Sequence, residues 1–226
     1  MADQITRRVL LGSASAAIAA TAAGTATGAE ASKSGAVKIV AVSCSPRKGK
    51  TTAGALGKCL EGAKAANSRI ETELIELAGL DIDGSLAAGV SLGKGRTDDF
   101  PGIAARLSDP NLGAVIIGTP VYFSGMTSLC KAFIERLMVF WRKGSFAGKV
   151  AGVVAVGGSR NGGQEVTIRS VQDCLFCYDM TLVGTGKRFG AAVWSKAPGG
   201  DTDGLGQAEN LGRRVAKTAL VLKAKA

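Results

Sequence analysis

The chain has 226 residues, a net charge of +10 and no histidine. That length allows one sizeable domain plus an N-terminal extension, and a hydrophobic share of 46% is enough for a buried core. The absence of histidine excludes Ser-His-Asp and Cys-His hydrolases and any His-ligated zinc or haem. The charge favours a solvated basic surface over a nucleic-acid site, because aromatics make up only 5% and do not alternate with basic residues.

The first 31 residues differ from the rest. Arg7-Arg8 precede a mildly apolar stretch of small residues, and Ala29-Glu30-Ala31 forms a small-residue cleavage pattern. A membrane anchor would need about 20 strongly apolar residues, more than this stretch offers. We therefore predict a twin-arginine signal peptide over residues 1–31, export to the periplasm and no stable membrane insertion.

Beyond this segment, strands and helices alternate. In chain order we expect strands over 37–43, 71–77, 112–119, 149–156 and 180–184, with helices over 51–66, 98–107, 127–141, 164–178 and 205–223. Near-continuous apolar runs such as 112–119 are typical of strands buried on both faces. The alternation predicts one α/β domain over 36–226, a parallel sheet covered by helices on both faces. In such folds ligands bind beyond the carboxyl ends of the strands.

The loop after the first strand, residues 43–52, carries hydroxyl and basic side chains into a helix N-terminus, which suits a phosphate. Residues 44–51 nearly match the nucleotide P-loop, with Gly49-Lys50-Thr51 in register. Cys44, however, replaces the first glycine, and no later strand ends in an aspartate that would hold magnesium. A phosphate site that needs no magnesium fits better, and a basic turn without any ligand stays open as an alternative.

Two further loops have unusual compositions. The segment 118–126 places Tyr122 and Phe123 at the exit of the best buried strand, where they suit either packing or the walls of a flat heteroaromatic ring. The segment 157–165 has four glycines in its first seven residues, which allow a close backbone approach to a ligand or simple flexibility. Three such loops at corresponding strand ends predict one shared site.

The five cysteines are widely spaced and odd in number, so they indicate no disulfide framework. Cys174 and Cys177 form a lone CxxC motif. Two interpretations stay open for this pair, ordinary buried residues of a helix or a redox pair. No metal site is expected, because a tetrahedral site needs four ligands and the other cysteines are scattered.

Taken together, the motifs of the three loops resemble the NADPH-dependent FMN reductase and iron–sulfur flavoprotein family. The similarity rests on Ser45-Pro-Arg-Lys48 followed by Thr51-Thr52, on the run 115–123 with the following 131–136, and on 157–165. It covers about residues 36–215. The resemblance implies a flavodoxin-like, doubly wound five-stranded parallel sheet of order 2-1-3-4-5, with FMN as the cofactor.

Carried onto this sequence, the resemblance implies a cofactor site in three parts. The phosphate of FMN would be surrounded by Ser45, Arg47, Lys50, Thr51 and Thr52. The isoalloxazine ring would be flanked by Pro120, Val121, Tyr122 and Phe123. Its other edge would be closed by Gly157, Gly158, Ser159, Arg160, Asn161 and Gly162. No catalytic acid or base is expected, since FMN carries the chemistry.

The family resemblance predicts an FMN-dependent oxidoreductase. It would pass hydride or electrons from NAD(P)H or another donor to quinone-like or other small acceptors, or to a redox protein. The alternative is a non-enzymatic periplasmic FMN electron carrier between redox proteins. The resemblance also implies a homodimer or homotetramer. Iron–sulfur members carry cysteines between the second strand and the Asp98-Asp-Phe100 helix, but residues 80–96 have none here, so no cluster is expected.

Overall fold

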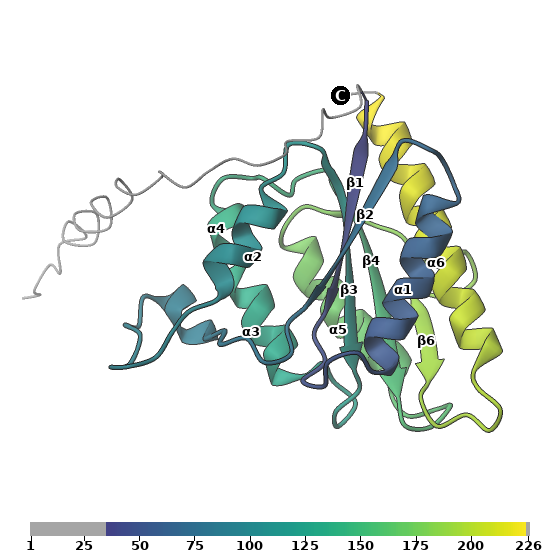
Figure 1. Ribbon diagram of the computed structural model, residues 1–226, viewed down its shortest axis with the longest axis horizontal. Helices are drawn as coiled ribbons and strands as arrows, with labels where there is room; N and C mark the ends of the chain where they lie inside the picture. The colour runs from purple at the N-terminus through teal and green to yellow at the C-terminus, as the bar shows by residue number, and fades with distance from the viewer. Residues whose placement is uncertain (1–34, 225–226) are drawn as a thin grey trace, which may run out of the picture. The chain divides into compact units, whose positions relative to one another are not determined.

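A parallel sheet forms the centre of the structure, a computed structural model that describes residues 35–224 (Figure 1). The strands lie in the order β2-β1-β3-β4-β5, and β6 also pairs with β4. Their bounds are β1 (Val37–Ser43), β2 (Ile70–Glu76), β3 (Leu112–Pro120), β4 (Val150–Gly157), β5 (Thr181–Leu182) and β6 (Ala191–Trp194). The pairings are parallel throughout, which confirms the predicted flavodoxin-like order. The predicted signal segment 1–31 lies outside the described residues.

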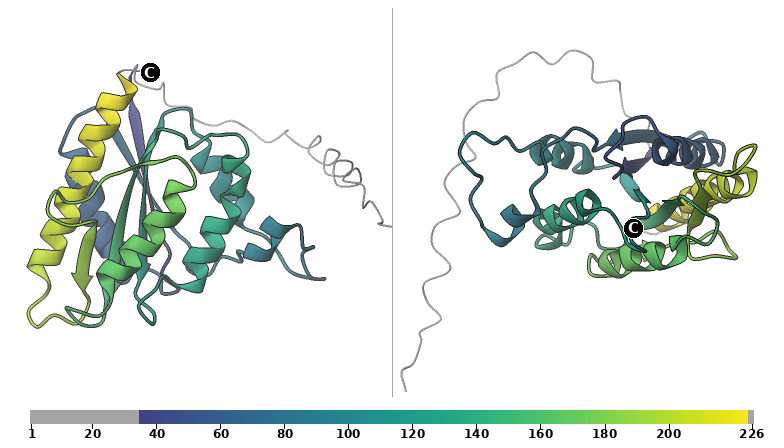
Figure 2. Two further views of the ribbon diagram at one scale, coloured as in Figure 1. Left: turned by 180° about the vertical axis from the view of Figure 1, so that it is seen from behind. Right: turned by 90° about the horizontal axis from the view of Figure 1, so that it is seen from below.

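Helices cover both faces of the sheet. Their bounds are α1 (Thr51–Lys64), η1 (Gly84–Ala88, a 3-10 turn), α2 (Phe100–Leu107), α3 (Ser128–Arg136), α4 (Met138–Trp141), α5 (Gln164–Phe176) and α6 (Thr202–Lys223). One apolar cluster joins the sheet to α1 and α6, which lie side by side in Figures 1 and 2. A second cluster joins the opposite face to α2, α3 and α5. Among the described helices, none is long and apolar enough to cross a membrane.

The central strands are buried on both faces. All eight residues of β4 are buried, and in β3 only Gly113 is more than slightly exposed. Gly118 of β3 lies where a Cβ would come within 2.6 Å of Leu56 on α1, so the glycine allows the helix to pack closely on the sheet. The near-continuous apolar runs predicted from the sequence thus correspond to strands with a helix on each side.

The fifth position of the sheet is interrupted. β5 pairs with Val150 and Ala151 at the start of β4, whereas β6 pairs with residues 154–157 at its end. Residues 183–190 leave the sheet between them. The predicted strand 180–184 is therefore confirmed for two residues only, and β6 was not predicted.

Side chains accept hydrogen bonds from the backbone N–H groups on the outer edge of β6. The backbone N–H of Ala192 donates to Gln207 Oε1 at 3.2 Å, and that of Trp194 donates to Asp201 Oδ2 at 2.6 Å. Asp201 also accepts from the backbone N–H of Gly204 and so begins α6 as its N-cap. An edge strand with free N–H groups can pair with an additional strand. At β6 these N–H groups are already bonded to Gln207 and Asp201, so they are not available to another strand.

Two other segments differ from the sequence-based prediction. The helix expected over 127–141 is divided at Leu137, whose N–H is shared between the carbonyls of Phe133 and Ile134. This tightening of the last turn separates α3 from α4. The segment 80–97, for which no helix or strand was predicted, contains η1, which begins with Asp83 accepting from the N–H of Ser85.

Candidate cofactor site

The three predicted loops meet at the carboxyl edge of the sheet, the lower edge in Figure 1. The N–H of Cys44 donates to the carbonyl of Gly118 at 2.8 Å, and the hydroxyl of Thr127 donates to the carbonyl of Cys44 at 2.8 Å. The N–H of Val121 donates to the carbonyl of Val156 at 2.9 Å. The loops after β1, β3 and β4 are therefore joined by hydrogen bonds, as expected for parallel strands that end together.

The loop after β1 has the features of an anion site. Ser45 is buried, and its hydroxyl oxygen accepts from the N–H of Arg47 at 3.1 Å, which closes a tight turn. Helix α1 then begins at Thr51 without any side-chain cap, so the N–H groups of its first turn are free of the usual intrahelical partners. The side chains of Arg47 and Lys50 are exposed beside it. An uncapped helix N-terminus flanked by two cations suits a phosphate dianion.

Two residues of this loop are part of the core. Thr52 is only 3% exposed, so a large substitution there would disturb the fold. Cys44 stands where the P-loop pattern has its first glycine. Its side chain lies fully buried beside Cys130 in the core, where burial raises the pKa of the thiol well above its ordinary value. The Cys44 side chain therefore does not occupy the space inside the phosphate loop.

The loop after β3 forms a tight reversal. Tyr122 and Gly125 pair in an isolated antiparallel bridge, and Phe123 and Ser124 between them both have positive φ, at 50° and 58°. Consecutive left-handed residues other than glycine are uncommon and cost energy, so this turn is held by its surroundings. Its aromatic side chains are open, with Tyr122 45% exposed and Phe123 fully exposed. Both rings are thus available to a ligand and are not part of the core.

The glycine-rich loop after β4 has a defined conformation rather than being merely flexible. The side chain of Gln164 is buried; its Nε2 donates to the Ser159 carbonyl at 2.5 Å, and its Oε1 accepts from the N–H of Gly162 at 2.8 Å. Gly163 has a φ of 94° and lies against Ser124 of the neighbouring loop, where a Cβ would come within 2.8 Å of the hydroxyl oxygen. Gln164 therefore fixes the conformation of this loop, and Gly163 allows its close approach to the loop after β3.

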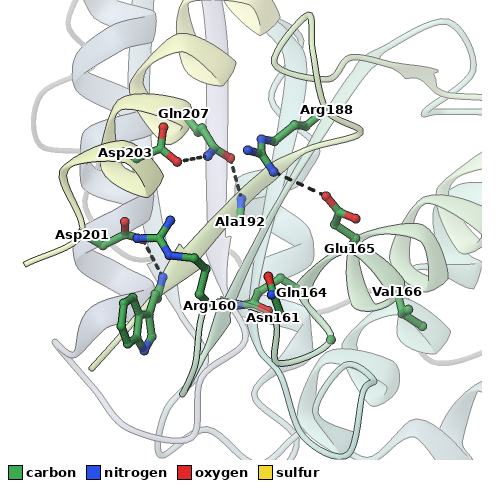
Figure 3. A pocket seen from close by; sticks show the side chains of 12 residues that line it. Arg160, Asn161, Gln164, Glu165, Val166, Arg188, Ala192, Asp201, Asp203 and Gln207 are labelled. Atoms are coloured by element: carbon green, nitrogen blue, oxygen red, sulfur yellow. Dashed lines mark hydrogen bonds and ion pairs between the residues drawn. The ribbon is translucent and has the colours of Figure 1, made fainter. Parts of the chain in front are cut away.

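A cavity of about 370 Å³, which we call the fifth-strand cavity, lies on the α6 side of the glycine-rich loop (Figure 3). Arg160 and Asn161 line it together with Trp194 of β6, and the Arg160 guanidinium stacks over the indole ring at 5.3 Å. Arg188 and Glu165 form an ion pair across it at 3.5 Å. The cavity shares Arg160 and Asn161 with the three-loop site, but it includes none of the phosphate-loop or Tyr122–Phe123 residues.

The two cysteines of the CxxC motif lie at the C-terminal end of α5 in different environments. Cys174 lies in the last turn of α5 and Cys177 is its C-cap. Burial raises the pKa of the Cys174 thiol. Cys177 is exposed, so the interpretation of both cysteines as buried helix residues is wrong for this one.

Comparison with known proteins identifies the protein family of this chain. The family model of the NADPH-dependent FMN reductases matches residues 37–192. The chain belongs to this family. An iron–sulfur flavoprotein of Methanocaldococcus jannaschii is 32% identical over 196 residues, which cover 83% of this chain and 100% of that protein. An iron–sulfur flavoprotein of Methanosarcina thermophila is 32% identical over 71% of this chain and 84% of its own length.

Solved structures confirm the fold. An oxidoreductase from Corynebacterium diphtheriae superposes with a TM-score of 0.64 at 19% identity, covering 84% of this chain and 98% of that one. A structure of the NADH:FMN oxidoreductase EMOB gives a TM-score of 0.60 at 23% identity, with 82% of this chain and 89% of that one covered. These likenesses, together with the strand order, establish the flavodoxin-like fold.

The described residues fit FMN and do not fit an iron–sulfur cluster. The uncapped N-terminus of α1, the buried Ser45 turn and the open Tyr122–Phe123 rings match the phosphate and the ring of FMN. Within residues 35–224 no group of three or more Cys, Asp or Glu side chains could hold a metal ion. The segment 80–96 also lacks cysteine, so the absence of a cluster stays our prediction.

Three positioning residues were missed by the sequence analysis. Thr127 joins the loops after β1 and β3 and also caps α3 by accepting from the N–H of Cys130. Gln164 holds the glycine-rich loop, and Glu76 at the end of β2 accepts from the N–H of Gly49 at 2.7 Å. Thr127 alone had a readable signal, a threonine just before a helical pattern.

Proposed function

We propose that the chain is an FMN-dependent oxidoreductase whose cofactor lies across the three joined loops. The phosphate would bind residues 45–52, the ring would lie against 120–123, and residues 157–162 would close its other edge. The observation that carries the proposal is the uncapped N-terminus of α1 at the point where the loops after β1, β3 and β4 converge. Family membership supports FMN as the ligand.

In this site the protein binds and orients. Ser45, with the N–H groups of α1, would hold the phosphate, while Arg47 and Lys50 would neutralise its charge. Gln164 fixes the conformation of the glycine-rich backbone, which would close the other edge of the ring. When bound, FMN supplies the hydride and electron chemistry, so no side chain has to act as acid or base.

We further propose that NAD(P)H or another donor reduces the protein and that a quinone-like or other small molecule accepts the electrons. A second candidate is a non-enzymatic FMN carrier that exchanges electrons with other proteins. The open Tyr122–Phe123 turn favours this candidate, because a partner could approach a ring placed there closely. We also propose export of the chain by the twin-arginine route and a homodimeric or homotetrameric assembly.

The phosphate site can be tested without disturbing the fold. Thr51 is the first residue of α1 and is partly exposed, so Thr51→Glu adds a charge that a helix N-terminus tolerates well. That charge would repel the FMN phosphate, and we expect at least about a tenfold loss of FMN affinity. Thr51→Gln, a neutral side chain of the same size, serves as the control. FMN affinity is measured by fluorescence quenching, with ATP–magnesium as a parallel ligand.

Equal FMN affinities for the two variants, or tight ATP binding by the unmodified protein, would contradict the phosphate assignment. The donor and the role are tested next with the FMN-loaded protein under anaerobic conditions. Bleaching of the flavin absorbance by NADPH, followed by rapid reoxidation with a quinone, supports the enzyme. A flavin that no nicotinamide reduces argues against NAD(P)H as donor and leaves the FMN assignment intact.

A further inference from the structure

A second surface feature lies at the interrupted fifth strand, outside the three loops. It is an open groove of about 450 Å³, which we call the basic groove. Its lining residues come from α5, from the 182–189 segment and from α6: Glu165, Arg169, Gln172, Phe176, Leu182, Gly184, Gly186, Lys187, Arg188, Phe189 and Arg214. Four of these side chains are cationic and only one is acidic, so the groove has a strongly positive character.

The loop that forms one wall of this groove is rigidly anchored. The buried side chain of Gln172 on α5 donates to the carbonyl of Phe189 at 2.7 Å. From α6, Asn210 donates to the carbonyl of Thr185 at 2.8 Å and Arg214 donates to the carbonyl of Gly184 at 2.9 Å. The loop therefore presents Lys187 and its neighbours in a preorganised arrangement, which lowers the entropic cost of binding.

The cations of the groove are available to an external partner. Lys187 has no hydrogen bond or ion pair among the described residues. Arg188 and Arg169 pair with Glu165 and Asp173 only at 3.5 and 3.6 Å, between side chains that are about half exposed or more. Such pairs contribute little to stability, so exchanging them for a partner's carboxylates costs little.

Exposed aromatic side chains lie among these charges. Phe176 is 58% exposed and Phe189 is 55% exposed, and the Arg169 guanidinium lies over the Phe189 ring at 5.1 Å. Exposed phenylalanines surrounded by arginine and lysine have the composition of a protein–protein interface, with an apolar centre and a charged periphery. Small-molecule sites enclose most of their ligand, whereas the cationic and aromatic side chains of this groove are about half exposed.

We propose that the basic groove docks the acidic face of a partner protein, with an apolar side chain of that partner seated between Phe176 and Phe189. Docking would use the side chains of the groove, since the nearby edge of β6 is already bonded by Gln207 and Asp201. The groove shares Arg188 and Glu165 with the fifth-strand cavity, which reaches the glycine-rich loop (Figure 3). A docked partner would thus lie next to the FMN site, and this functional consequence rests on the function proposed above.

The test uses cytochrome b5, an acidic electron-transfer protein, as the probe and cytochrome c, a basic one, as its counterpart. Isotope-labelled full-length protein, with and without FMN, is titrated at low ionic strength and followed by amide chemical shifts. We expect cytochrome b5 to shift the amides of residues 184–189 and of the exposed face of α5, and cytochrome c to leave them unchanged. Lys187→Glu should weaken this binding about tenfold, and raising the salt to about 0.15 M should weaken it further.

Lys94→Glu is the matched control, since Lys94 is exposed in the 80–97 segment and the variant has the same net charge as Lys187→Glu. Equal affinities of the two variants, or no binding of cytochrome b5 by the unmodified protein, would overturn the proposal. Binding to anionic phosphatidylglycerol vesicles with the same amide shifts, but not to cytochrome b5, would assign the groove to a membrane surface instead. Because the shifts are measured with and without FMN, failure of docking is distinguished from failure of FMN binding.

Discussion

β3 and β4 run side by side over seven paired residues, whereas the fifth position of the sheet is divided between two short strands. In the first region, stability comes from apolar side chains that helices cover on both faces. In the second, side chains such as Gln172, Gln207 and Asp201 bond directly to the backbone. The comparison shows that a regular sheet can end in a segment whose shape depends on individual hydrogen bonds.

The largest loss of stability is expected where α1 and α6 pack together with no space for an additional atom. Helices α1 and α6 approach so closely that a Cβ at Gly212 would overlap the backbone of Cys59. Gly212→Ala should therefore destabilise the protein by about 3 kcal/mol, because one of the two helices must shift. Urea unfolding followed by circular dichroism measures this loss.

Gly206→Ala in the same helix is the control for helix propensity. No atom lies within 4 Å of a Cβ at that position, so this variant should gain up to about 1 kcal/mol. Similar effects of the two substitutions would contradict the close approach of α1 and α6.

The next effect concerns the junction between the loops of the cofactor site. Thr127→Val keeps the side-chain shape but removes the bonds to the Cys44 carbonyl and the Cys130 N–H, both of which are buried. We expect a loss of about 2 kcal/mol in the free energy of unfolding, together with weaker FMN binding. Thr127→Ser retains the hydroxyl and should retain FMN affinity. If Val and Ser behave alike, the hydroxyl does not join the loops.

How far the sequence predicts this architecture differs between the two regions. The buried runs 112–119 and 149–156 were located within one residue, because strands covered on both faces leave a continuous apolar pattern. β6 was missed because four residues between glycine-rich turns have no such pattern, and its place depends on Gln207 and Asp201 from a later helix.

The candidate site shows the same division. Ser45, Thr51 and the glycine-rich loop were predicted from local composition and the family resemblance, since glycine and hydroxyl residues after a strand are visible in the sequence. Gln164 and Glu76 were not found as positioning residues. Their roles come from contacts with backbone groups whose position only the folded chain defines. The burial of Thr52 likewise depends on tertiary packing.

A smaller effect is expected at the fifth strand. Asp201 is 9% exposed and accepts from the N–H groups of both Trp194 and Gly204. Asp201→Ala removes a helix cap and an edge-strand bond, which should cost about 1.5 kcal/mol. Hydrogen exchange should show the loss first at the Trp194 amide, because the opening is local.

Asp203→Ala, two residues along, removes a first-turn carboxylate of α6 and its bond from the Gln207 side chain but leaves both bonds of Asp201, so it should cost only about 0.5 kcal/mol. Uniformly faster exchange throughout β3 and β4 in Asp201→Ala would argue against an independently held fifth strand.

The smallest effect depends on pH and belongs to the regular region. Arg136 of α3 donates to both carboxylate oxygens of Asp98, at 2.9 and 2.7 Å, with 10% and 19% of the two side chains exposed. This hydrogen bonding holds the pKa of Asp98 below its ordinary value of 3.8. A depressed carboxyl pKa adds stability at pH values above the unfolded-state pKa, and this contribution is lost as the pH falls through the folded-state pKa.

Asp98→Asn should therefore cost about 1 kcal/mol at neutral pH, and its difference in stability from the unmodified protein should shrink between about pH 5 and pH 2. Urea unfolding across this range tests the sign, with Asp173→Asn, which loses a looser and more exposed pair, as the control. A difference that grows on acidification would mean that the Asp98 carboxylate is not stabilised by Arg136.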